Sequence, residues 1–165
     1  MKAKPRKNGV PPLIGWREWV ALPDLGVGAI KAKVDTGART SALHAWKVER
    51  FIRKGQPWVR FDVHPVQRDN KQSMRCEAPL LGTRVVRNSG GGAQERLVIR
   101  TALQIGGRSW PIDVTLTSRD QMGFRMLLGR TAVRGRFVVD PKRSFLLSPQ
   151  SGTRPRAQRK RMRQR

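Results

Sequence analysis

Asp35 is the residue whose type and position in this sequence most clearly suggest chemistry. It follows the alternating stretch 29–34 and begins an Asp-Thr-Gly-Ala run, in which the glycine permits a sharp turn. A carboxylate held at the end of a strand can accept and donate a proton as a general base or acid. The same tripeptide also occurs where the Asp only accepts hydrogen bonds from the amides of an ordinary turn. The motif alone leaves both interpretations open.

A metal site is the second kind of chemistry that the residue types allow. The nitrogen and sulfur ligands that zinc prefers are limited to His44, His64 and Cys76. They lack His-Glu-x-x-His spacing, and scattered residues of these kinds are more often core or hydrogen-bonded groups. The sequence also lacks the Gly-x-x-x-x-Gly-Lys-Ser/Thr phosphate loop of an ATP site. We therefore expect no cofactor and keep a zinc metallopeptidase as a rival hypothesis.

Short strands joined by glycine turns are predicted to position Asp35. The apolar or alternating runs that indicate strands are 13–22, 29–34, 58–63, 84–87, 95–105, 109–116 and 126–129. Segment 42–51 is predicted as a strand or short helix, 130–134 as one helical turn, and 136–140 with 144–147 as a closing hairpin. The glycine-rich stretch 88–93 predicts a flexible hairpin tip. Many strands and little helix indicate an all-β fold, a small closed barrel or sandwich.

The order of these features resembles the retropepsin-like aspartic proteases. The alternating strand leads into Asp-Thr-Gly-Ala, a glycine-tipped hairpin follows, and Leu127-Leu128-Gly129-Arg130 comes near the end. In that family the apolar-apolar-glycine strand packs beside the catalytic loop, and the hairpin is a flap over the substrate. The resemblance implies a single retropepsin-like domain with a flap hairpin and one short helix.

Longer strings resemble a bacterial family labelled "ATP-dependent zinc protease", which is associated with the RimK ribosomal-protein glutamate ligase. The matching strings are residues 14–20, 31–45 and 122–130. The ATP and zinc parts of that label find no motif in this sequence. The resemblance implies a hydrolase, an aspartic-type peptidase that trims the polyglutamate tail which the ligase adds to a ribosomal protein.

A single Asp-Thr-Gly in the chain implies a homodimer. Aspartic hydrolysis uses two carboxylates that share one proton, and 165 residues leave no room for a duplicated lobe. A twofold axis would bring two Asp35 side chains together. We predict Asp35, Thr36 and Gly37 as catalytic residues, with the Thr36 hydroxyl bracing the loop and Gly37 permitting the turn and a close approach.

Arginines near the predicted cleft indicate an acidic substrate. A guanidinium group binds a carboxylate through two parallel hydrogen bonds. For any single arginine the alternative is a solvated side chain or one paired with Asp or Glu. The predicted substrate-binding residues are Arg39, Thr40, Arg87, Asn88, Ser89, Gly90, Gly91, Arg119, Arg125 and Arg130.

The positive charge is concentrated in both ends of the chain but is not confined to them. The formal net charge is +24, with four Lys/Arg in residues 1–8 and seven in 154–165; without those eleven, 24 basic and 11 acidic residues leave +13. We predict one peptidase domain over 13–148 between disordered basic tails at 1–12 and 149–165. The tails either contact RNA or the ribosome, or serve only solubility.

Two further expectations concern partners and location. A noncatalytic ribosome- or RNA-binding module with a protease-like fold is the other rival hypothesis, although no RNA-recognition motif is present. The single Cys76 cannot form a disulfide within the chain, which fits a reducing compartment. Because no apolar run approaches the length of a membrane span and the basic N-terminus lacks a hydrophobic signal segment, we expect a cytoplasmic protein without membrane contact.

Overall fold

The chain folds as a β-rich domain in a computed structural model that describes residues 9–66, 71–87, 90–118 and 123–148. The elements are β1 (Leu13–Gly15), β2 (Arg17–Leu22), the 3₁₀-helix η1 (Pro23–Leu25), β3 (Val27–Asp35), β4 (Ser41–His44), β5 (Trp46–Arg53), β6 (Gln56–Val63), β7 (Met74–Arg87), β8 (Ala93–Ile105), β9 (Arg108–Thr117), β10 (Met126–Gly129), α1 (Arg130–Val133) and β11 (Val138–Asp140). This confirms the all-β class with one short helix. Among the described residues no helix has the length and apolar character needed to cross a membrane.

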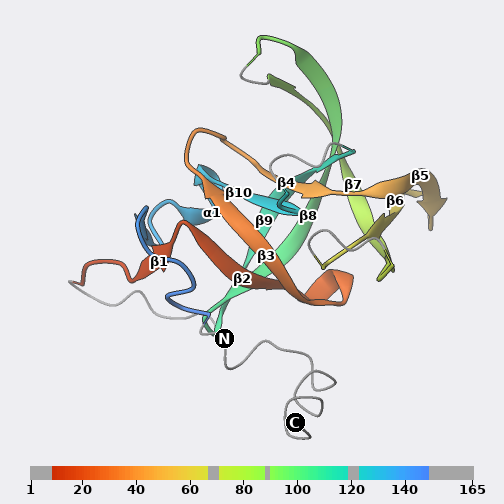
Figure 1. Cartoon of the computed structure of the whole chain (residues 1–165). Helices are drawn as coiled ribbons and strands as arrows, with labels where there is room; N and C mark the ends of the chain where they lie inside the picture. The colour runs from red at the N-terminus through yellow and green to blue at the C-terminus, as the bar shows by residue number, and fades with distance from the viewer. Residues whose placement is uncertain (1–8, 67–70, 88–89, 119–122, 149–165) are drawn as a thin grey trace, which may run out of the picture.

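The main sheet closes on itself. Its nine strands follow the order β2-β3-β10-β4-β9-β8-β7-β6-β5, and β2 also pairs with β8 through Ala21 and Gln104. The strands from β2 to β8 in this order therefore form a ring, and β7, β6 and β5 continue the sheet beyond it (Figure 1). The apolar core is lined by the ring strands and also by buried residues of β6 and β7. Closing a sheet in this way removes exposed strand edges from the ring.

The strand that ends at Asp35 has the predicted alternation. In β3 the side chains of Ile30, Ala32 and Val34 are buried, and those of the intervening lysines are partly exposed. Because side chains of a strand point alternately to its two faces, this pattern anchors one face of β3 in the core. The anchored strand fixes the position from which Asp35 emerges.

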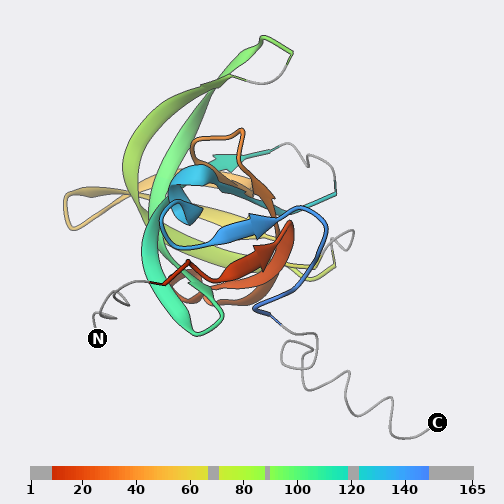
Figure 2. The ribbon, with the colours of Figure 1, turned by 90° about the vertical axis from the view of Figure 1, so that its left-hand side faces the viewer.

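The predicted glycine-tipped hairpin is longer than its sequence pattern indicated. β7 begins at Met74, where its first half pairs with β6, and its second half pairs with β8. A register shift lies between Leu80 and Gly82, and Gly82 has a φ of 147°. Beyond this bulge the hairpin extends from the barrel on the side where the loop after β3 rises (Figures 1 and 2).

The predicted closing hairpin of 136–140 with 144–147 is wrong. β11 pairs in parallel with β1, and residues 144–147 form no strand. Instead, the buried carboxylate of Glu18 accepts hydrogen bonds from the amides of Leu146 (2.7 Å) and Leu147 (3.3 Å), and from the Ser148 hydroxyl. The Phe145 amide donates to the carbonyl oxygen of Arg17 in β2, and the next two amides are satisfied by the Glu18 side chain, so the segment makes no hairpin with β11.

Segment 42–51, predicted as a strand or a short helix, divides between the two strands β4 and β5. β4 lies inside the sheet, where it pairs with β9 in parallel and with β10 in the antiparallel sense. All four residues of β4 are buried. This central place lets β4 hold the far end of the loop that begins at Asp35.

Candidate active site

The Asp35 side chain is held by the loop that follows it. Its Oδ1 atom accepts hydrogen bonds from the amides of Gly37 (3.0 Å) and Ala38 (3.2 Å), and the residue is partly exposed. Gly37 does not have a positive φ; a Cβ at that position would lie 3.3 Å from Asp35 Oδ1. A larger residue at position 37 would therefore crowd the carboxylate by a few tenths of an ångström, while the turn needs no unusual backbone there.

β10 lies between the two strands that the Asp35 loop connects, β3 and β4. It pairs with β3 in parallel, with Gly129 opposite Asp35, and with β4 on its other side. The Gly129 amide donates a 3.0 Å hydrogen bond to the Ser41 hydroxyl, which is fully buried. The two ends of the loop are therefore joined to the same short strand, as the resemblance implied for Leu127-Leu128-Gly129.

Arg130 holds the loop from outside. Its Nη1 donates to the carbonyl oxygens of Thr36 (3.4 Å) and Gly37 (3.2 Å). Its backbone amide donates to Ala38. Thr36 itself is exposed, and its hydroxyl makes no hydrogen bond within the described residues. Within one chain Arg130 therefore supports the Asp35 loop as a positioning residue, and the bracing by the Thr36 hydroxyl stays a prediction for the dimer.

The hairpin contacts the loop directly. Arg84 of β7 donates a 2.6 Å hydrogen bond from Nη1 to the Thr40 hydroxyl, although the two residues are 44 positions apart. Arg84 also lies 3.8 Å from Asp113 of β9. The contact joins the base of the β7–β8 hairpin to the segment that follows Asp35, and a flap role of the hairpin stays a prediction.

The predicted substrate-binding residues divide into three groups. The residues at the described surface beside the loop or near the hairpin tip are Arg39, Thr40, Arg87, Gly90, Gly91 and Arg130. Asn88, Ser89 and Arg119 lie outside the described residues. Arg125 is only 4% exposed, and its guanidinium carbon lies 4.8 Å from the centre of the Trp46 ring. An arginine packed in this way is not at the surface where a substrate would arrive.

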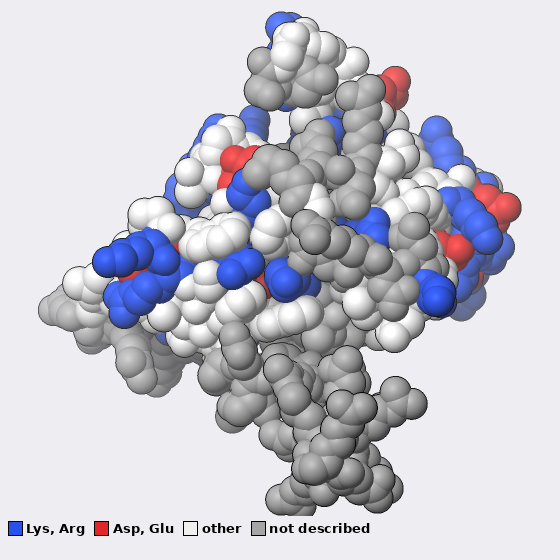
Figure 3. Space-filling model, in the orientation of Figure 1, with Lys and Arg blue, Asp and Glu red and all other residues white. Residues whose placement is uncertain are grey.

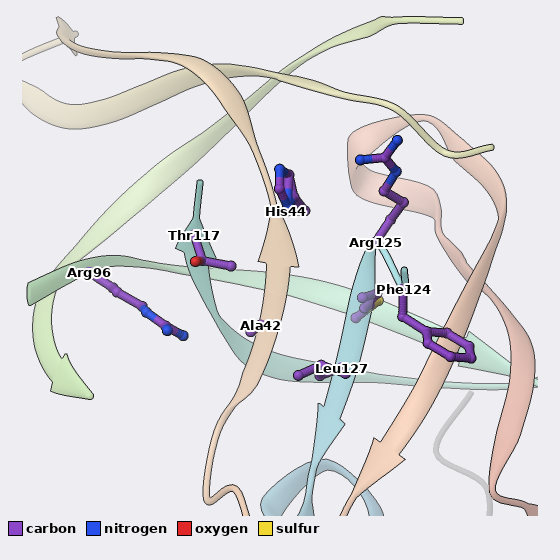
Figure 4. A pocket seen from close by; sticks show the side chains of 8 residues that line it. Ala42, His44, Arg96, Thr117, Phe124, Arg125 and Leu127 are labelled. Carbon is purple, nitrogen blue, oxygen red and sulfur yellow. The ribbon is translucent and has the colours of Figure 1, made fainter. Parts of the chain in front are cut away.

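A small cavity lies beside Arg125, between β4 and the start of β10 (Figure 4). Its lining includes His44, Arg96 and Thr117, and its volume is about 10 Å³. That volume holds at most one water molecule. It is too small for a peptide side chain, so the Asp35 loop remains the candidate site for chemistry.

The three zinc-ligand candidates have other surroundings. His44 and His64 both pack against the Trp46 ring, with ring centres 3.9 and 4.0 Å apart respectively. Burial, together with the nearby Asp62 carboxylate, raises the pKa of the Cys76 thiol to about 11, which disfavours the thiolate that binds zinc. No group of three His, Cys, Asp or Glu that could hold a metal ion occurs in the ranges that the structure describes.

Comparison with known families agrees with the geometry of the loop. The sequence model of a family described as "RimB-like: Retropepsin-like aspartic endopeptidase RimB" matches residues 13–150. This chain belongs to that family. The match confirms the expected retropepsin-like family and fold, and it does not carry the label of an ATP-dependent zinc protease.

Curated relatives in this family bear a different kind of name. Proteins named "Probable alpha-L-glutamate ligase" are 48% identical over 139 residues in Shewanella halifaxensis, 47% over 129 in Desulfotalea psychrophila and 51% over 135 in Parasynechococcus marenigrum. These matches cover 84%, 78% and 82% of this chain. The chain spans only 28–30% of the length of those relatives. The retropepsin-like part is thus one portion of a longer ligase-named chain.

A solved structure has the same fold. The crystal structure of a Legionella pneumophila protein of unknown function superposes with a TM-score of 0.70 at 27% identity. The match covers 84% of this chain and 99% of that one. The RimB-like domain therefore has an experimentally observed relative of nearly its own extent.

Sequence reasoning missed several residues that shape the site. Ser41 and Arg84 were not singled out, and their contacts with Gly129 and Thr40 come from segments far apart in the chain. Ser41 follows the Asp-Thr-Gly-Ala-Arg-Thr run directly and precedes the apolar pair Ala42 and Leu43, so it could have been identified as a polar residue entering the core. No local signal indicates the partner of Arg84.

Proposed function

We propose that this chain is the subunit of a homodimeric aspartic peptidase that cleaves acidic peptides, polyglutamate tails among them. The observation that carries the proposal is the Asp35 carboxylate, held through Oδ1 by two loop amides on a loop supported by Gly129 and Arg130. Membership of a family of retropepsin-like aspartic endopeptidases supports peptide hydrolysis. A single Asp-Thr-Gly in the chain supports the dimer.

In the proposed dimer, the two carboxylates divide the proton transfers between them. Asp35 removes a proton from a water molecule, whose oxygen adds to the peptide carbonyl carbon. The protonated Asp35 of the partner subunit donates its proton to the carbonyl oxygen. The C–N bond then breaks as Asp35 gives the proton that came from the water to the amine nitrogen. One hydroxyl proton of the intermediate returns to the partner's Asp35, which leaves a carboxylic acid and restores the starting protonation of the pair. The exposed Thr36 hydroxyl, which has no hydrogen bond within the described residues, is available to brace the partner's loop.

Charge and relatives together support an acidic substrate. On the face shown in Figure 3, basic side chains lie in several places and acidic side chains cover less of the surface. In the relatives named as glutamate ligases, the region similar to this chain makes up only 28–30% of the protein. A ligase that adds glutamate and a peptidase that removes it act on the same acidic tail, so we propose that this chain trims glutamate tails made by such a ligase, on a ribosomal protein in the first instance.

Incubation of the purified chain with polyglutamate peptides tests the proposal, with products identified by mass spectrometry. We expect Asp35→Asn to lower turnover at least about a thousandfold while melting temperature and sedimentation coefficient stay unchanged. Asp24→Asn, which alters an exposed carboxylate in η1, is the control and should retain turnover, because asparagine keeps an oxygen that can accept the hydrogen bond from the Ala102 amide. Full turnover by Asp35→Asn, or a strictly monomeric active enzyme, would overturn the mechanism.

A further inference from the structure

A larger cavity with a basic lining lies beside the Asp35 loop. A cavity of about 350 Å³ opens between the loop, the base of the hairpin and α1. Its lining residues are Arg39, Thr40, Arg84, Arg100, Pro111, Ile112, Asp113, Thr131 and Ala132. The volume lies within the range of about 300–1,000 Å³ that is typical of ligand pockets. Neither Arg84 nor Arg100 was singled out by the sequence.

The charges in this cavity do not balance. Three guanidinium groups face one carboxylate, so the formal excess is two positive charges. Asp113 is shared between Arg100, at 2.9 Å, and Arg84, at 3.8 Å. No ion pair joins Arg39 to an acid in the part of the chain that the structure describes, and its side chain is exposed. The unbalanced charge favours an anionic ligand.

The other lining groups suit the side chain of an acidic amino acid. Thr40 and Thr131 also line the cavity; the Thr40 hydroxyl accepts from Arg84, and the Thr131 hydroxyl donates to the carbonyl oxygen of Arg39. Pro111, Ile112 and Ala132 add apolar surface, against which side-chain methylene groups can pack. Cations that bind a carboxylate beside a small apolar patch match glutamate better than a bare phosphate.

The position of the cavity connects it to catalysis. Thr40 follows Asp35 by only five residues, a separation of at most about 18 Å even for fully extended chain. A substrate peptide of about five residues covers the same distance when extended. A peptide whose scissile bond lies at Asp35 can therefore place a side chain several residues away in this cavity.

We infer that this cavity is an anion-binding subsite of the proposed peptidase, which takes the carboxylate of a glutamate remote from the scissile bond through Arg39, Arg84 and Arg100. The inference rests on the proposed function, since it assumes that a peptide lies at Asp35. It makes two statements about specificity: acidic peptides are preferred over neutral ones, and peptides long enough to reach the subsite are preferred over shorter ones.

The test uses the Asp35→Asn chain, so that peptides are bound without being cleaved. Fluorescein-labelled hexaglutamate, diglutamate and hexaglutamine are titrated by fluorescence anisotropy. We expect Arg39→Gln/Arg100→Gln to raise the Kd for hexaglutamate at least about tenfold. The same variant should change the Kd for diglutamate by less than about twofold, because the short peptide does not reach the cavity.

A matched control removes two positive charges elsewhere. Arg50→Gln/Lys54→Gln alters exposed residues at the outer β5–β6 hairpin and should raise the Kd for hexaglutamate by less than about threefold. If loss of Arg100 disturbs folding, Arg39→Gln alone keeps the test valid, because the Arg39 side chain is exposed and forms no ion pair with a described acid. We expect this single substitution to raise the Kd for hexaglutamate about three- to tenfold.

The possible outcomes separate the subsite from the proposed function. Equal Kd values for the cavity and control variants would overturn the subsite, even if the unaltered chain cleaves polyglutamate. Cavity-dependent binding by a chain that never cleaves the peptide would support the subsite and overturn the peptidase. The same variants are also titrated with a fluorescein-labelled oligouridylate. If Arg39→Gln/Arg100→Gln raises the Kd for this RNA probe and leaves the Kd for hexaglutamate unchanged, the inference is overturned, because the cavity would then bind nucleic acid.

Discussion

The α-carbon of Gly129 lies directly against the backbone of Thr40. A Cβ placed on Gly129 would lie 2.5 Å from the carbonyl carbon of Thr40 and 2.8 Å from the amide nitrogen of Ser41. Neither atom belongs to a flexible side chain, so a larger residue must move the loop that carries Asp35. The glycine in the apolar-apolar-glycine pattern of β10 is thus a requirement of the contact between β10 and the Asp35 loop.

Gly129→Ala is expected to lower the free energy of unfolding by about 1–3 kcal/mol, because overpacking forces backbone shifts. Peptide cleavage should fall more strongly than stability, since the displaced loop holds the carboxylate. Urea denaturation and turnover measure the two effects. Gly28→Ala is the control: nothing lies within 4 Å of a Cβ at that exposed strand position, and we expect stability unchanged or slightly increased. Equal effects of the two variants would contradict this account.

Arg130→Gln is expected to reduce kcat about tenfold with a KM within about twofold of the unaltered chain. The reason is that the guanidinium supports the carbonyls of Thr36 and Gly37 and so positions the loop. Steady-state kinetics on a polyglutamate peptide measure the change, and Arg130→Lys should recover part of it. Arg134→Gln, at the exposed end of α1, is the control. A change confined to KM would assign Arg130 to substrate binding instead.

Glu18→Gln is expected to destabilise the fold by about 2–4 kcal/mol. The amides of Gly15, Leu146 and Leu147 all donate to Oε1 of this fully buried carboxylate. A glutamine that keeps its oxygen at that position places its NH2 donor against the Ser148 hydroxyl, which donates to Oε2 in the unaltered chain and already accepts from the Trp19 amide. Chemical denaturation checks the value. Glu95→Gln changes an exposed glutamate on β8 and should stay within about 0.5 kcal/mol of the unaltered chain. A similarly small effect at Glu18 would show that its hydrogen bonds are dispensable.

The raised pKa of Cys76 predicts a loss of stability at alkaline pH. The thiol titrates near 9.0 in an unfolded chain and at about 11 in the folded one, so the folded state binds more protons between these values. This contribution is complete below pH 9 and is lost as the pH rises towards 11. Urea midpoints across that range should fall less steeply in Cys76→Ala. Because the chain contains no tyrosine, thiolate absorbance at 240 nm reports the titration directly; a midpoint near 9 in the folded protein would contradict the prediction.

The sequence predicts those strands and turns whose pattern is local. The alternation of 29–34, the glycine-tipped hairpin and the apolar strand before Arg130 are each visible within a dozen residues, and each is confirmed. The parallel pairing of β1 with β11 depends instead on a register between segments more than a hundred residues apart. Local alternation does not specify such a partner, which is why the closing hairpin was predicted in its place.

One long-range contact did have a local signal. Glu18 lies on the same face of β2 as the buried Val20 and Leu22, because residues two apart on a strand share a face. A charged residue on an apolar face needs hydrogen-bonding partners, and this one binds the segment 146–148. The pattern could have indicated that Glu18 is buried and accepts hydrogen bonds, although it does not identify the amides that donate them. The arginines of the cavity carry no such signal, because their grouping arises only when the hairpin base meets the loop.

The hydrogen bonds that hold the Asp35 loop also determine at which stage of folding the candidate site forms. The bonds from Gly129 to Ser41 and from Arg130 to Thr36 span 88 and 94 residues. Contacts of such sequence separation form slowly, since the chain between them must first lose much of its freedom. A growing or partly folded chain that lacks β10 therefore carries Asp35 without its supports. The candidate site is therefore complete only after β10 has joined the sheet beside β3 and β4.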